Sequence, residues 1–154
     1  MAPSRTSNAS LRSEYSQGYV VGAGEINDDF GDEGPLSRTA NNHSNVVGMW
    51  QGILWADGHL ANSGRDCWFG PTTEAATKAW QKDHGLDDDG IVGPLTFGKA
   101  DYYLYWEGSE IRYDGSVRNL TGMLRDSQGR YYQQNSDGTR TYGSYTSADA
   151  LICS

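Results

Sequence analysis

A short motif occurs twice in this sequence of 154 residues, and it constrains the fold more than any other feature. Asp66–Thr73 aligns with Asp89–Thr96, and each copy reads acidic residue, turn residue, two apolar residues, Gly-Pro, one variable residue and threonine. Glycine permits a close backbone approach, and proline sets φ for a helix start. We expect each apolar pair to plug a core and each threonine to bond free N–H groups at a helix start. The repeat therefore predicts a small, compact helical unit.

The residues around the repeat have helical periodicity. Ser44 suits an N-cap, and Val47, Trp50 and Leu54 follow it on one face at i, i+3 and i+7. The Asp57-Gly58 pair predicts the end of that helix, because glycine readily adopts the left-handed terminal conformation. We expect three helices, beginning near residues 44, 71 and 94.

The last third of the chain changes to strand-forming segments. Residues 102–106 are aromatic and favour a strand. Asp114-Gly115 and Asp137-Gly138 are hairpin signals. We therefore predict an α+β fold in which a three-helix unit over 43–101 is followed by a small antiparallel β-meander over 102–154.

Residues 1–42 have the composition of a tail. The run Glu25–Gly34 holds five acidic residues, with Ile26 and Phe30 as its large apolar residues. Such a segment cannot bury enough apolar surface to offset the entropy lost on ordering. We expect a mostly disordered acidic segment, except that residues 19–21 can add a short edge strand.

Charge and hydropathy exclude two classes of protein. The formal net charge is −8 and is spread evenly along the chain, whereas phosphate binding requires clustered Lys and Arg. Nucleic acid is therefore not an expected partner. No stretch approaches the roughly 18 apolar residues that cross a bilayer, so we expect no membrane insertion. Only 36% of residues are hydrophobic, with tryptophans gathered in the helical unit and tyrosines in the meander, which suggests two small cores.

The two cysteines, Cys67 and Cys153, form no CxxC motif. They are either a disulfide pair or two unrelated thiols, and we expect the pair because a thiol so close to a chain end has little packing reason to exist unless it is tied down. The long loop that they close is worth about 4–5 kcal/mol on the chain-entropy model. A bridge implies an oxidising compartment. Residues 1–4 do not read as a signal peptide, so we expect a mature secreted form.

Three blocks of residues together form a known pattern. They contain Val47, Trp50, Gln51, Leu54 and Gly58; then Asp66, Phe69, Gly70, Pro71, Thr73, Ala76, Trp80, Gln81, Gly85 and Leu86; then Asp89, Gly90, Ile91, Val92, Gly93, Pro94, Thr96 and Phe97. Through them, residues 45–100 resemble the three-helix peptidoglycan-binding domain found beside bacterial and phage cell-wall hydrolases. The resemblance covers a little over a third of the chain.

A few positions depart from the family pattern. Trp50 replaces leucine, Thr77 replaces valine and Phe97 replaces tryptophan; all three are plausible core exchanges. Cys67 stands where the family usually has glycine, which fits the use of that turn as a disulfide anchor.

The resemblance implies a glycan or stem-peptide ligand. Aromatic rings stack on sugar faces, while amides and carboxylates bond hydroxyl groups. Trp55 falls off the centre of the apolar helix face, and Trp68 occupies the variable site of its motif, so each is either ligand-facing or part of the core. Gln51, Asp66 and Asp89 are candidate polar contacts; for the two aspartates, capping and turn formation are the alternative.

Signatures of catalysis are missing from the sequence. His43, His59 and His84 show no HxH or HExxH spacing. The acidic run 87–89 lacks the first and twelfth ligands of an EF-hand loop. Serine-hydrolase and phosphate-loop motifs are absent. We expect no metal, no cofactor and no catalysis.

Taken with the predicted disulfide, the resemblance implies a secreted bacterial cell-wall protein that binds peptidoglycan without cleaving it. Because such walls are themselves anionic, we expect short-range contacts rather than electrostatic steering. Two alternatives stay open. One is a secreted interaction or inhibitory protein whose Tyr- and Arg-rich meander is a protein-binding face. The other is a cell-wall peptidase or amidase with unrecognised catalytic residues.

Overall fold

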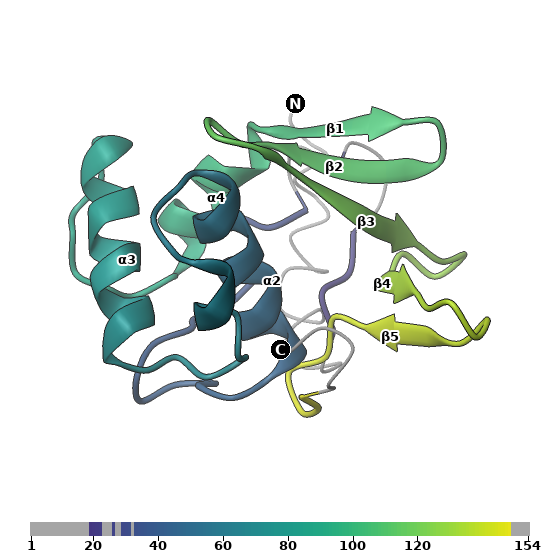
Figure 1. The fold of residues 1–154 in the computed structure, drawn as a ribbon, viewed down its shortest axis with the longest axis horizontal. Helices are drawn as coiled ribbons and strands as arrows, with labels where there is room; N and C mark the ends of the chain where they lie inside the picture. The colour runs from purple at the N-terminus through teal and green to yellow at the C-terminus, as the bar shows by residue number, and fades with distance from the viewer. Residues whose placement is uncertain (1–18, 23–25, 27–28, 32, 149–154) are drawn as a thin grey trace.

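The computed structural model describes residues 19–22, 26, 29–31 and 33–148. In these described ranges, three α-helices lie beside one antiparallel sheet (Figure 1). The helices are α2 (Asn45–Ala56), α3 (Pro71–Asp83) and α4 (Pro94–Asp101), with a 3₁₀ turn, η3 (Asn62–Gly64), between the first two. The three predicted helices are confirmed. No helix in the described ranges is long and apolar enough to span a bilayer.

Five strands form the sheet: β1 (Leu104–Glu107), β2 (Glu110–Asp114), β3 (Asn119–Arg125), β4 (Tyr131–Gln134) and β5 (Arg140–Tyr142). They follow one another in chain order, each antiparallel to the next. The two predicted hairpin signals lie at the β2–β3 and β4–β5 turns. The α+β fold class, with a helical unit followed by an antiparallel meander, is confirmed.

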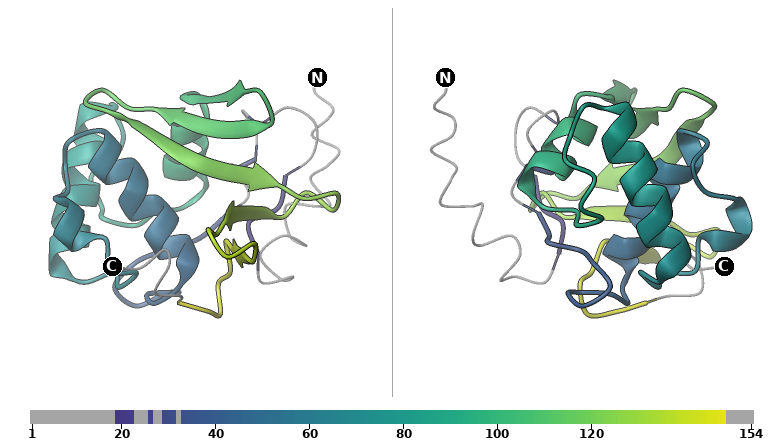
Figure 2. Two further views of the ribbon diagram at one scale, coloured as in Figure 1. Left: turned by 45° about the vertical axis from the view of Figure 1, so that its right-hand side comes forward. Right: turned by 90° about the vertical axis from the view of Figure 1, so that its left-hand side faces the viewer.

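Helix α2 lies between α3 on one side and strands β2 and β3 on the other (Figures 1 and 2). All of its residues except Met49 and Trp55 are buried. Because it is enclosed on several sides, it carries apolar or small residues around most of its circumference. A Cβ at Gly52, for example, would lie 3.0 Å from the side chain of Leu120 in β3. The predicted N-cap is also present, since the Ser44 hydroxyl accepts the N–H of Val47.

A buried glutamine in α2 holds the first copy of the repeat. The Gln51 Nε2 donates to Asp66 Oδ1 (3.1 Å), the Trp68 carbonyl (2.9 Å) and Thr73 Oγ1 (2.9 Å). Its Oε1 accepts the N–H of Cys67 at 2.8 Å. A single side chain therefore fixes the whole loop that leads into α3.

Gln81 in α3 repeats this arrangement in the second copy. Its Nε2 donates to Asp89 Oδ1 (3.0 Å), the Ile91 carbonyl (2.9 Å) and Thr96 Oγ1 (3.0 Å), and its Oε1 accepts the N–H of Gly90 (2.9 Å). The threonines of the repeat thus bond to glutamine amides. In place of the expected bonds to free N–H groups, the structure shows Thr73 Oγ1 and Thr96 Oγ1 accepting from the glutamines, and the N-caps of α3 and α4 are Gly70 and Gly93.

The described part of segment 1–42 is packed against the rest of the molecule, which corrects the expected disorder there. Val20, Phe30 and Leu36 are each at most 1% exposed. Residues 19–21 form bridges to Ser144 and Arg130, as predicted for a short edge strand. Residues 1–18 lie outside the described ranges. Among the described residues of this segment, Val20, Ile26, Phe30 and Leu36 belong to the core.

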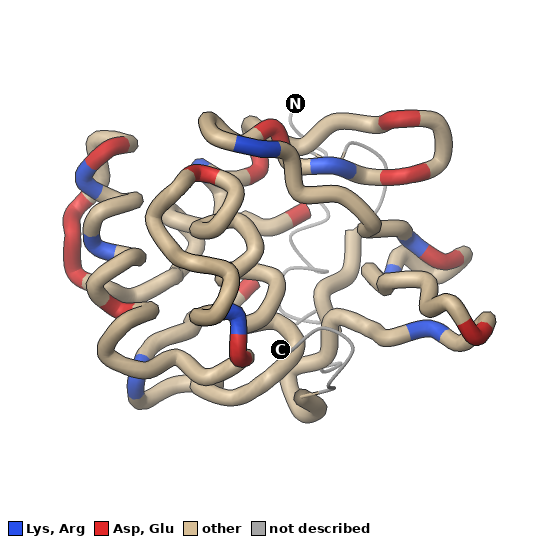
Figure 3. Tube along the Cα trace, in the orientation of Figure 1, with Lys and Arg blue, Asp and Glu red and all other residues tan. Residues whose placement is uncertain are grey.

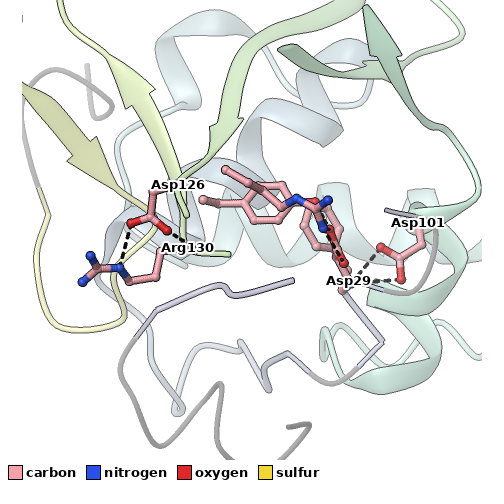
Figure 4. Close-up of polar contacts among 7 residues, drawn as sticks. Asp29, Asp101, Asp126 and Arg130 are labelled. Carbon is pink, nitrogen blue, oxygen red and sulfur yellow. Dashed lines mark hydrogen bonds and ion pairs between the residues drawn. The ribbon is translucent and has the colours of Figure 1, made fainter. Parts of the chain in front are cut away.

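Buried carboxylates hold this segment in place (Figure 4). Asp29 is 2% exposed and accepts hydrogen bonds from the Tyr131 hydroxyl and from Arg125. Asp101, at the end of α4, accepts the N–H of Phe30 at 2.8 and 3.0 Å. Burial and the charge of Asp29 raise the pKa of Tyr131, so that its hydroxyl stays a donor. Acidic residues that read as solvated in the sequence therefore serve as internal acceptors.

Composition predicted two small cores, but the described residues form a single core. A single cluster of buried apolar residues contains Phe30 from the N-terminal segment, Trp50 and Trp80 from the helices, and Ile111 and Tyr131 from the sheet. The helical unit and the meander thus share their interior.

Replacing a core residue of the N-terminal segment tests this packing in solution. We expect Phe30→Ala to lower the free energy of unfolding by about 3–5 kcal/mol, because it removes a buried ring. Leu95→Ala, at a position that is 81% exposed, should change it by less than about 0.5 kcal/mol. Chemical denaturation measures both. Equal effects of the two substitutions would show that the segment does not pack.

The glutamine networks give a second test. Gln81→Glu keeps the shape of the side chain and removes its N–H donors, so three acceptors lose their partner. We expect the free energy of unfolding to fall by about 3 kcal/mol. The control is Lys82→Ala at the exposed neighbouring position, which should change the free energy of unfolding by less than about 0.5 kcal/mol. A Gln81→Glu variant as stable as the parent would contradict the role assigned to this amide.

Candidate functional site

Two adjoining hollows lie where the helical unit meets the sheet, and we call them together the junction groove. The larger has a volume of about 560 Å³ and the smaller about 360 Å³, and His59 lines both. The larger is also lined by Asp57, Asp83, His84, Tyr103, Asp114 and Ser116, and the smaller by Trp55, Asn62 and Arg118.

Asp57 fixes the wall of the larger hollow. It is the C-cap of α2, and the glycine after it has a φ of 81°, as expected at such a helix end. Its Oδ2 accepts from Trp80 Nε1 at 2.7 Å and from the Tyr113 hydroxyl at 2.5 Å, and its Oδ1 accepts the N–H of Ser116 at 2.8 Å. Burial and the bond to Asp57 raise the pKa of Tyr113, so this hydroxyl stays protonated. One carboxylate thus joins α2, α3 and β2.

Two histidines lie in the larger hollow. His59 Nε2 is 2.9 Å from Asp83 Oδ2, and the side chain of Asp83 is 63% exposed. His84 stacks on the ring of Trp80 at a centroid distance of 3.9 Å, and its Nδ1 donates to the Trp80 carbonyl at 2.8 Å. Both imidazoles are therefore held in fixed orientations at the ends of α2 and α3.

Trp55 lies in the smaller hollow and is half-buried. The guanidinium carbons of Arg65 and Arg118 lie 4.8 and 4.7 Å from its ring centroid. Arg118 also donates to the Trp55 carbonyl. Cations placed over an indole in this way are favourable and hold the ring in place. Trp55 is thus a positioned ring beside a basic group, it packs against the core, and its role in binding stays a prediction.

Trp68 lies outside the junction groove. It is 52% exposed, and its ring stacks on His43 at a centroid distance of 3.6 Å and an interplanar angle of 9°. Of the two alternatives left open for Trp68, this exposure excludes a place in the core, and its role in binding stays a prediction.

The three polar candidates do not reach the groove. Gln51 is fully buried, and its amide is used within the protein. The structure thus gives Gln51 an internal role, and a ligand contact for it stays an untested prediction. Asp66 and Asp89 each use Oδ1 to accept both a glutamine amide and a backbone N–H two residues ahead. This is the turn-forming role given above as their alternative, and a ligand contact for either stays a prediction.

The groove residues were not among the sequence candidates, apart from Trp55. His59 and His84 each follow the end of a predicted helix, and Arg118 follows a predicted turn, but no spacing links them. They come together because Asp57 joins the helices to the sheet. Among the described residues, no group of His, Cys, Asp and Glu could hold a metal ion.

Charges of both signs are interspersed along the chain (Figure 3), in agreement with their even spread in the sequence. Cys67 is fully buried and has a φ of 66°, a left-handed conformation that favours glycine. Its predicted partner, Cys153, lies outside the described residues, so the bridge between them stays a prediction.

Comparison with known proteins supports the resemblance of the helical unit. Residues 44–99 match a family model described as "Putative peptidoglycan binding domain". The chain is also 57% identical over 37 residues to a protein of Kitasatospora aureofaciens described as "Uncharacterized protein in bpoA1 3'region". That match covers 24% of this chain and 31% of the length of that protein. No solved structure matches the chain. Residues 44–99 are thus similar to the putative peptidoglycan binding domain family.

Proposed function

We propose that this chain is a secreted, non-catalytic protein that binds peptidoglycan in the bacterial cell wall. The match of residues 44–99 to the family model carries the proposal. It is supported by the two intact glutamine-held loops, because these give the matched segment a defined surface.

The junction groove is the proposed binding surface. Ligand sites are concave and combine an aromatic wall with a few oriented polar groups, and a total volume of 300–1,000 Å³ is typical. The groove has this volume, one half-buried indole and polar side chains on both sides. Part of its wall comes from the matched helical unit and part from the meander. We therefore assign the meander a share in binding.

Retention on purified, teichoic-acid-free peptidoglycan tests the proposal. We expect the full chain to sediment with this material, and Trp55→Ala to weaken the apparent association about tenfold through loss of the aromatic wall. Trp106→Ala removes an exposed tryptophan of β1 outside the groove and should leave retention unchanged. Thermal melting of each variant shows that it is folded.

Three outcomes of this experiment are decisive. Absence of the parent protein from the pellet would overturn the proposed function. Equal loss in the Trp55→Ala and Trp106→Ala variants would remove the groove as the binding surface. A falling turbidity of the peptidoglycan suspension would show cleavage and contradict a non-catalytic role.

Secretion rests on the predicted Cys67–Cys153 bridge, because such bonds persist in oxidising compartments. The left-handed backbone at Cys67 suits a residue retained for its sulfur, since glycine is the favoured residue there. We expect intact mass after alkylation without reductant to show no added label. Two labels under these conditions would show two thiols and remove this support for secretion.

A second candidate function uses a surface of the sheet that we call the Tyr/Arg face, made of Tyr19, Arg130, Tyr132, Arg140 and Tyr142. The guanidinium carbon of Arg130 lies 4.9 Å from the ring centroid of Tyr142, and that of Arg140 lies 4.3 Å from the ring centroid of Tyr132. Tyrosine and arginine are common anchors of protein interfaces. This face supports the alternative of an interaction or inhibitory protein with a protein partner.

A further inference from the structure

The junction groove has opposite charges at its two ends. The larger hollow is lined by the carboxylates of Asp57, Asp83 and Asp114 and by the imidazoles of His59 and His84. The smaller hollow is lined by one charged side chain, the guanidinium of Arg118. His59 lies between the two ends because it lines both hollows. A ligand that spans the groove therefore meets an acidic end and a basic end.

The charged groups of the groove differ in how many contacts they already make within the protein. Asp57 accepts three hydrogen bonds from the protein. Asp83 pairs with His59, yet its side chain is 63% exposed. Asp114 is exposed and takes part in none of the ion pairs in the described part of the chain. Arg118 is exposed and uses one donor on a backbone carbonyl, and a guanidinium has five donors. Asp83, Asp114 and Arg118 thus retain capacity for a ligand.

We propose that the junction groove binds a short peptide that carries an ammonium group at one end and a carboxylate at the other. The ammonium lies against Asp83 and Asp114, and the carboxylate lies against Arg118. This inference rests on the proposed function, in which the peptide is the stem peptide of peptidoglycan.

A neutral glycan fits these observations less well. The acetamido sugars of a neutral glycan have no ammonium group to pair with Asp83 and Asp114, and no carboxylate to engage Arg118. Trp55 offers a ring at the basic end, but the side chains of Arg65 and Arg118 already lie over it. A sugar that stacks there must displace one of them, whereas a carboxylate binds to Arg118 in its present place.

The test uses the full chain and a synthetic tetrapeptide, Nα-acetyl-L-alanyl-D-isoglutaminyl-L-lysyl-D-alanine. Its charges are one side-chain ammonium and one terminal carboxylate. Titration calorimetry compares it with its Nε-acetyl and C-terminal amide derivatives and with chitotetraose. We expect each derivative to bind about threefold to fivefold more weakly, as for a partly exposed ion pair, and chitotetraose more weakly than the parent peptide.

Variants assign each charge to its end of the groove. The double variant Asp83→Asn/Asp114→Asn should bind the parent peptide about threefold to fivefold more weakly than the unchanged protein does. Its affinity for the Nε-acetyl derivative should be unchanged. Arg118→Gln should lower the affinity for the parent peptide to a similar extent and leave the affinity for the amide derivative unchanged. Asp87→Asn and Lys78→Gln, which change exposed charged residues outside the groove, should alter the affinity for none of these ligands.

The negative results distinguish failure of this inference from failure of the proposed function. Retention of the chain on insoluble peptidoglycan without binding of the tetrapeptide overturns this inference and leaves the proposed function standing. The same holds if both derivatives bind as well as the parent peptide, or if chitotetraose binds more tightly. No retention and no peptide binding removes the proposed function together with the inference.

Discussion

The carboxylate of Asp57 is the contact on which the arrangement of helices and sheet depends. It ends α2, receives the indole N–H of Trp80 from α3 and the hydroxyl of Tyr113 from β2, and holds the turn at Ser116. Hydrogen bonds to a charged acceptor are stronger than those between neutral groups. Because all three donors meet at one side chain, the helices, the sheet and the hollow between them have one relative position.

In the two loops of the repeat, a single side chain likewise makes several hydrogen bonds. Gln51 and Gln81 each satisfy the same four groups from the interior side, so the loops need no further side chain to hold them. The bonded N–H belongs to a residue with positive φ in both loops, Cys67 and Gly90. A cysteine in place of glycine at the first of these adds backbone strain. The two loops lead into the N-termini of α3 and α4, whereas the junction groove is lined by residues at the C-terminal ends of α2 and α3.

Much of the fold could be predicted from residue patterns, because those patterns report local requirements. The Gly-Pro pairs, the N-cap at Ser44 and the two Asp-Gly turns each act within a few residues, and each is found where expected. The described part of segment 1–42 shows where this reasoning fails. Its average composition is that of a tail, but Phe30 and Leu36 are enclosed by residues from distant parts of the chain. Average polarity does not report whether a few apolar side chains find a cavity of the right shape.

The sequence by itself determined the three helices, the meander and the resemblance of residues 44–99, since these follow from spacing and backbone preference. Only the tertiary structure decided that there is one core, that Gln51 is internal, and that Trp55, His59, Asp83, Asp114 and Arg118 line one groove. These residues lie on separate elements and share no motif. Their meeting depends on how α2 packs between α3 and the sheet, which is a property of the whole interior and not of any local stretch of residues.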